Sequence, residues 1–182
     1  MRRQRSLVII LVIFIICLHI FLLFQTVFWP ATEFRIYPYL TTKGLLPYKD
    51  FVDQHFPGVF SLPINLYSVG LATPGGLRAI QIAIVSISQI LIFLLTKKIS
   101  TKSTTAFFAM LLYLLLQVTF EGYVLWVDSF IAPLLLASAY LLLSKPQHTF
   151  RSGIPLLVSG IFLAIALSFK QQIVIIFSFV LV

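Results

Sequence analysis

Charged residues are scarce in this chain of 182 residues, and acidic residues are the scarcest. Only 10% of the residues are charged, five are acidic, and 60% are hydrophobic. Because ordinary soluble domains carry about 25% charged residues, this composition excludes a soluble domain. The single cysteine, Cys17, excludes a disulfide bond within the chain.

Long apolar runs replace the missing charges. Each complete run can cross about 30 Å of hydrocarbon as a helix that rises about 1.5 Å per residue, and a helix satisfies its own backbone in lipid. The sequence predicts an all-α polytopic membrane protein. Because the last run is too short to cross, we expect residues 1–182 to be the N-terminal part of one transmembrane domain. The predicted spans are 7–28, 77–96, 104–120, 124–143, 153–169 and a partial span at 173–182, with an outer loop at 29–76.

The net charge of +8 does not indicate nucleic-acid binding, because the basic residues follow the order of the spans. Eight of them fall on one predicted face without any acid, which is the pattern of cytoplasmic loops. We therefore expect a cytoplasmic N-terminus in a cell or plasma membrane and an extracytoplasmic outer loop. These eight are Arg2, Arg3, Arg5, Lys97, Lys98, Lys102, Lys145 and Arg151.

All the acidic residues fall on the opposite face. A bilayer protein with so few acids does not need to gather them at one end for solubility. Their clustering at the mouth of a helical bundle suggests either chemistry on a polar substrate or a path for cations. They are Glu33, Asp50, Asp53, Glu121 and Asp128.

The outer loop is too long and too aromatic for a simple connection, since functional or disordered segments dominate loops beyond about 12–15 residues. Thr32 and Glu33 suit the start of a helix, and Gly44 suits its end, so residues 31–43 are predicted as a helix on the membrane surface. The apolar stretch 59–72 is too short to cross. It is predicted as an interfacial or re-entrant helix.

The motifs of this loop resemble the first outer loop of GT-C glycosyltransferases, in the branch of protein O-mannosyltransferases and lipid A aminoarabinose transferases. That family commonly has an Asp-Glu pair where this chain has Glu33 alone, and Gly44 comes about one helical turn early. The matching elements are Glu33, Tyr37, Gly-Leu-Leu-Pro-Tyr at 44–48, Asp50, Pro57, Pro63 and Arg78.

The resemblance implies a GT-C-like transmembrane bundle with two juxtamembrane helices in the outer loop. It also implies a polyprenyl-phosphate-linked sugar as donor, bound at the extracytoplasmic face, and inversion at the anomeric carbon. A carboxylate of the first outer loop would be the catalytic base, which assigns that role to Glu33 and places Asp50 and Tyr37 in the matched motif.

Each candidate acid also has a structural interpretation. Glu33 is either the base or an acid that caps a helix in the headgroup region. Asp53 and His55 are candidates for binding a divalent metal ion, and solvated loop charges are the alternative. Asp50 is a catalytic candidate. Asp128 either shapes a polar pocket together with Asp53 and Tyr37 or lies at the surface.

Basic residues on the outer side are candidates for binding the donor phosphate, because Arg and Lys are the usual phosphate ligands. We expect Arg78 and Lys170 to have this role, although a lone Lys can also extend to lipid headgroups. Arg35 is interpreted as balancing the local acids.

Together these features predict a membrane glycosyltransferase, either a hexosyl- or a pentosyltransferase. It would move a sugar from a polyprenyl-phosphate carrier to a hydroxyl group of a glycan, lipid or protein acceptor at the extracytoplasmic face. The alternative is a fragment of a polytopic transporter or flippase, in which acids relay protons or cations. That alternative is less favoured, because relay acids usually lie deep within spans.

Overall fold

The computed structural model describes residues 2–29, 31–52, 57–60, 64–143 and 153–170, apart from the side chains of residues 2–5 and 59. These residues form α-helices and one 3-10 turn, with no β-strand among them. The elements are α1 (Arg2–Gln25), α2 (Glu33–Thr42), η1 (Pro57–Val59), α3 (Pro74–Ser100), α4 (Ser103–Phe120), α5 (Val127–Leu142) and α6 (Gly153–Phe169).

Within the described residues, three helices are long and apolar enough to cross a membrane: Ser6–Gln25 of α1, α3 and α4. The apolar helices α5 and α6 are shorter. Many large apolar side chains on these helices are exposed, including Phe14 and Phe108, as expected where a helix faces lipid rather than water. The prediction of an all-α membrane bundle is confirmed.

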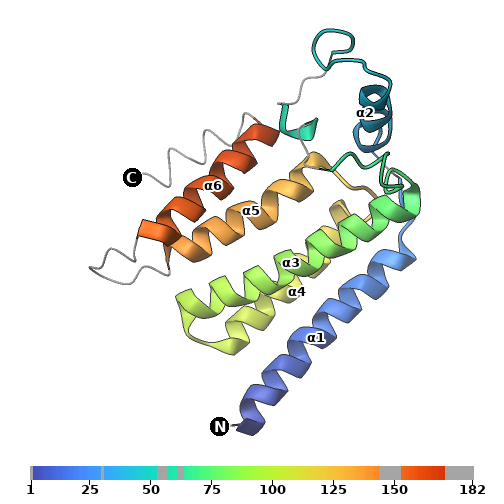
Figure 1. Cartoon of the computed structure of the whole chain (residues 1–182). Helices are drawn as coiled ribbons and strands as arrows, with labels where there is room; N and C mark the ends of the chain where they lie inside the picture. The colour runs from blue at the N-terminus through green and yellow to red at the C-terminus, as the bar shows by residue number, and fades with distance from the viewer. Residues whose placement is uncertain (1, 30, 53–56, 61–63, 144–152, 171–182) are drawn as a thin grey trace.

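The long helices lie side by side, and α2 and η1 lie beyond one end of them (Figure 1). We call this the α2 end of the bundle. Helix α3 packs against α1, α4 and α5, and α6 packs against α5. The α2 end has its own apolar core, which includes Phe34, Leu77, Leu125 and Phe169. This core fixes α2 to the ends of the long helices.

Buried polar side chains join the helices inside the bundle. His19 Nε2 lies 2.8 Å from the Gln117 side-chain oxygen, and the Gln89 amide nitrogen lies 2.9 Å from His19 Nδ1. These bonds connect α1, α3 and α4. Each such bond between membrane helices contributes about 1 kcal/mol or less.

The first predicted juxtamembrane helix is present as α2, and Gly44 ends it with a left-handed backbone (φ +81°). The second prediction, a helix over 59–72, is not found among the described residues, where 64–72 forms turns. Asn65 and Gly70 give a physical reason. The Asn65 side-chain oxygen accepts from the backbone N–H groups of Tyr67 and Ser68 at 3.0 and 3.1 Å, as at the start of a helix, but Gly70 adopts a left-handed backbone (φ +73°) that ends the turn at once.

The 3-10 turn η1 packs against α6. Gly58 is buried there, and a side chain at this position would collide with the backbone of Ser168. Only glycine therefore allows the outer loop to approach the end of α6 so closely.

Candidate active site

A pocket of about 440 Å³ lies at the α2 end. Its polar groups come from four separate elements: Glu33 from the first turn of α2, Glu121 after α4, Asp128 from the first turn of α5, and Lys170 after α6. Phe120, Trp126 and Val127 complete the lining. We call this the carboxylate pocket. It brings together Glu33, Asp128 and Lys170, three of the residues predicted from the sequence.

Lys170 is held by Asp128 across the pocket. Its Nζ lies 2.8 Å from each carboxylate oxygen of Asp128, and the two side chains are 31% and 51% exposed. A pair this exposed contributes little to stability, about 0–1 kcal/mol. Its main effect is to position an ammonium group at the pocket surface, where a phosphate would compete with Asp128 for it.

Glu121 is the residue of this pocket that the sequence analysis did not select as a site residue. Burial raises the pKa of its carboxyl group, the charge of Asp128 raises it further, and Lys170 opposes both effects. A carboxyl group with a raised pKa stays protonated at higher pH, so it can donate a hydrogen bond as well as accept one.

Arg78 lies behind the pocket rather than in it. Its side chain is 7% exposed and donates to the carbonyl oxygens of Leu23, Thr26 and Gly122, at 2.9 Å for Thr26 and 2.6 Å for Gly122. It also donates to the side-chain oxygen of Gln81 at 2.6 Å. The guanidinium thereby joins the end of α1 to the turn that carries Glu121.

Gln81 completes this fastening one turn further along α3. Its amide nitrogen donates to the backbone oxygens of Glu121 at 3.0 Å and Val124 at 2.8 Å. The spacing of Arg78 and Gln81 by three residues, which places both on one helix face, was the sequence signal for this joint role.

Comparison with known families identifies the family to which the chain belongs. A sequence model of the family described as dolichyl-phosphate-mannose-protein mannosyltransferase matches residues 54–182, which is more than half of the chain. The chain belongs to this family. No curated protein and no solved structure matches the chain.

Membership of the mannosyltransferase family identifies a multi-pass membrane glycosyltransferase. Its sugar donor belongs to the general class of polyprenyl-phosphate-linked sugars. It favours the transferase prediction over the transporter or flippase. The matched range contains Arg78, Glu121, Asp128 and Lys170 but begins after Glu33. The role of Glu33 therefore depends on its place in the pocket.

Asp50 and Tyr37 lie outside the carboxylate pocket. Asp50 is exposed and accepts a hydrogen bond from the backbone N–H of Leu46 at 2.7 Å, in the part of the loop that extends away from the helices (Figure 1). The Tyr37 ring stacks on the Phe51 ring with centroids 5.2 Å apart and packs at a tilt of 44° against the Phe60 ring with centroids 5.1 Å apart. These contacts hold the loop against α2.

The metal candidates Asp53 and His55 lie outside the described residues. In the described ranges, no three His, Cys, Asp or Glu side chains gather closely enough to bind a metal ion. The carboxyl groups of Glu33, Glu121 and Asp128 line one pocket without forming such a cluster.

An apolar pocket, also of about 440 Å³, adjoins the carboxylate pocket. It shares Phe120, Glu121 and Asp128 with that pocket, and it continues between α3, α4 and α5. Most of its remaining walls are apolar: Ile84, Val85, Tyr113, Leu116, Gln117, Ser129 and Ala132. An amphiphile could therefore place a charged head beside Lys170 and an apolar chain among the helices.

Proposed function

We propose that this protein transfers mannose from a polyprenyl phosphate to a hydroxyl group of a protein acceptor at the extracytoplasmic face, with the carboxylate pocket as the active site. One observation supports this most strongly. Glu33, Asp128 and Lys170, which are far apart in the sequence, line one pocket at one end of the bundle. The family match supports the donor class and the sugar.

Glu33 acts as the general base in this proposal. Its carboxylate takes the proton from the acceptor hydroxyl, the hydroxyl oxygen bonds to the anomeric carbon, and the bond from that carbon to the phosphate oxygen breaks. The polyprenyl phosphate leaves with the bonding electrons. Positioned general bases contribute about 10²–10⁴-fold to the rate. Inversion, which the resemblance implies, requires Glu33 and the phosphate to lie on opposite sides of the sugar.

Lys170 stabilises the departing phosphate, because charge develops on that group as the bond breaks. In the structure Asp128 holds the ammonium group in the pocket. When phosphate binds, it replaces part of this contact, and Asp128 keeps Lys170 in position. Glu121, protonated over a wider pH range than an ordinary glutamic acid, donates a hydrogen bond to the phosphate or the sugar.

The beginning of the polyprenyl chain lies in the adjoining apolar pocket. This arrangement is supported by the residues that the two pockets share and by the apolar surface between α3, α4 and α5. The sequence analysis also predicted Arg78 as a phosphate ligand. Because its side chain already donates to backbone oxygens of three residues, we assign phosphate binding to Lys170 and fastening to Arg78.

The proposed orientation places the α2 end outside the cytoplasm. Lys97 and Lys98 lie in the last turn of α3, at the end of that helix opposite to Arg78. Basic residues at one end and acidic residues at the other follow the bias of cytoplasmic loops toward positive charge.

Transfer measured with the purified protein in lipid nanodiscs, a polyprenyl-phosphate-mannose donor and a hydroxyl-bearing peptide tests this proposal. Glu33→Gln should lower kcat by about 100-fold or more, because it removes the base, while donor binding stays within about three-fold, since the amide keeps the shape of the side chain. Lys49→Gln is the matched control, because Lys49 is an exposed outer-loop residue that lines neither pocket.

Near-normal turnover in the Glu33→Gln protein would refute the assignment of the base. Equal rates of transfer from polyprenyl-phosphate-mannose and from mannose on a neutral carrier would refute the donor class. If Glu33→Gln lowers kcat only in part, a Glu33→Asp variant shows whether Glu33 is a base or a purely structural acid. A base that is shifted but present should recover part of kcat, whereas a purely structural acid should change the melting temperature instead.

A further inference from the structure

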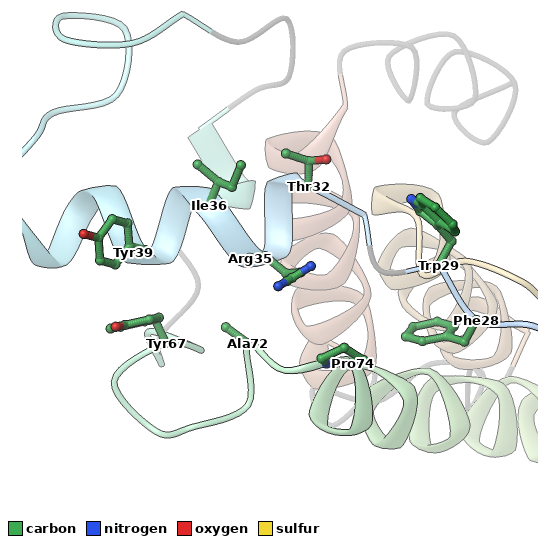
Figure 2. A pocket seen from close by; sticks show the side chains of 9 residues that line it. All are labelled: Phe28, Trp29, Thr32, Arg35, Ile36, Tyr39, Tyr67, Ala72 and Pro74. Carbon is green, nitrogen blue, oxygen red and sulfur yellow. The ribbon is translucent and has the colours of Figure 1, made fainter.

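A second pocket, of about 630 Å³, lies on the other side of α2 and takes no part in the proposed transfer. Its charged group is Arg35, and we call it the arginine pocket. Four aromatic side chains also line it: Phe28, Trp29, Tyr39 and Tyr67. Figure 2 shows Arg35 extending from α2 into the space above Pro74, the first residue of α3.

Arg35 makes no ion pair with any acid in the described part of the chain, and none of the residues that line the pocket is acidic. The prediction that Arg35 balances the local acids is therefore not supported among these residues. Glu33, two positions earlier, faces the carboxylate pocket instead. An exposed guanidinium with five N–H donors is left available to a ligand from outside.

Two further cations adjoin the pocket across its aromatic rings. The Nζ of Lys43 lies 5.5 Å from the centre of the Tyr39 ring, and the Arg78 guanidinium lies 4.7 Å from the centre of the Phe28 ring. Because both rings line the pocket, the two cations lie near its wall and add to the positive charge of Arg35. The pocket is therefore complementary to an anion.

The position of the pocket indicates which anion. Phe28 and Trp29 follow directly after α1, and Pro74 begins α3, and both helices are candidate membrane spans. The pocket thus lies where the chain leaves the hydrocarbon, the depth at which aromatic rings and lipid phosphates meet. Trp29 is 74% exposed and Ile36 is 46% exposed, so apolar surface continues outward from the guanidinium.

We propose that the arginine pocket binds the phosphate group of an anionic phospholipid, with Arg35 as its principal ligand. The guanidinium donates two parallel hydrogen bonds to phosphate oxygens, the geometry that arginine favours. The aromatic rings contact the glycerol region, and the acyl chains lie along the apolar surface near the end of α1. This site differs from the donor site, because it uses the opposite face of α2.

Native mass spectrometry of the protein, released from vesicles of phosphatidylcholine and phosphatidylglycerol in equal amounts, tests the proposal. The wild-type protein should retain phosphatidylglycerol in preference to phosphatidylcholine. Arg35→Gln should weaken that retention about ten-fold, because hydrogen bonds between charged groups are among the strongest that a side chain makes. Lys49→Gln removes an exposed outer-loop charge outside the pocket and should leave retention unchanged.

Equal retention by the wild-type and Arg35→Gln proteins, or equal retention of the two lipids, would overturn the proposal. Inorganic phosphate is added in a second arm. If it displaces the lipid at millimolar concentration and binds with equal affinity, the site recognises free phosphate and the lipid assignment is wrong.

Two further variants keep the test decisive. Arg35→Lys retains the charge and should recover most of the preference for phosphatidylglycerol. Ile36→Glu introduces a carboxylate at an exposed wall position and should abolish the preference, which decides the question if Arg35→Gln does not fold. Because the readout is lipid retention and not mannose transfer, failure of this proposal leaves the proposed transferase site unaffected.

Discussion

Helix α2 separates two pockets of opposite charge. On one face Glu33 joins Glu121, Asp128 and Lys170, and on the other Arg35 lies among aromatic rings. Glu33 and Arg35 are only two residues apart, but a helix turns by about 200° over two residues and sends them to opposite sides. The comparison teaches that the helical phase decides the chemistry of each charge in this loop.

The two pockets have different chemistry, but one residue, Arg78, supports both. Arg78 lies under Phe28, a wall of the arginine pocket, and donates to the carbonyl oxygen of Gly122, next to Glu121 of the carboxylate pocket. Substitutions can therefore distinguish residues that support one pocket from residues that support both.

Arg78→Met should have the largest effect and should disturb both pockets. It leaves the carbonyl oxygen of Thr26 and the side-chain oxygen of Gln81 without this donor, and orphaned buried groups cost about 1–3 kcal/mol each. The carbonyl oxygens of Leu23 and Gly122 lose one of their donors but keep the Thr26 hydroxyl. We expect the free energy of unfolding, measured by denaturation in mixed micelles, to fall by about 3 kcal/mol or more. Mannose transfer and phosphatidylglycerol retention should fall together.

Lys97→Met is the control for this prediction, because Lys97 lies at the other end of the same helix, where its ammonium group lies 5.6 Å from the centre of the Phe93 ring. Its effect should stay within about 1 kcal/mol. If Arg78→Met impaired one pocket and left the other intact, the claim that Arg78 supports both pockets would be disproved.

Lys170→Met should affect the carboxylate pocket alone. Removing the ammonium group deprives the donor phosphate of its proposed partner, so the KM for the donor should rise about ten-fold. Retention of phosphatidylglycerol should not change, because Lys170 does not line the arginine pocket. Kinetics and native mass spectrometry on the same preparation check both statements, and a parallel loss of lipid would show that the pockets are not independent.

Glu121→Gln should have the smallest effect, visible as a change in the pH dependence of stability. The folded-state pKa of Glu121 lies above its unfolded value, so the wild-type protein loses stability as pH rises from the ordinary carboxyl range through the raised value. Below that range both states are protonated and the term vanishes. Melting temperatures of the two proteins should therefore agree in acid and diverge as pH rises above the ordinary carboxyl range, with the variant higher.

Equal pH profiles for the Glu121→Gln and wild-type proteins would mean that this carboxyl group is not shifted. The comparison of pockets predicts a further distinction. Arg35→Gln, on the other face of α2, should leave the shape of the pH profile unchanged, because it does not line the carboxylate pocket.

The sequence predicted the bundle well, because membrane helices follow directly from the length of apolar runs. It also predicted Glu33, Asp128 and Lys170 as site residues, since charges are rare enough here for each to be informative. It did not predict that Asp128 and Lys170, 42 residues apart, form an ion pair. Such a contact depends on how α5 packs against α6.

Three other outcomes depended on interactions that sequence patterns do not encode. The segment 64–72 forms turns because the turn that Asn65 starts is ended a few residues later by the left-handed backbone of Gly70. Arg78 resembled a phosphate ligand by its place beside the loop, but its side chain bonds to carbonyl oxygens of three residues. Arg35 was expected near the acids, and only the phase of α2 shows that it faces away.

The contact of Gly58 with Ser168 also has a consequence for biosynthesis. The outer loop emerges early during translation, but the surface on which η1 packs is supplied by α6, near residue 168. Until α6 has been synthesised and inserted into the membrane, η1 has no surface to pack against, and Lys170 has not yet been made. The nascent chain therefore carries Glu33 without these partners, and the proposed transferase site is completed only after α6 and Lys170 have been synthesised.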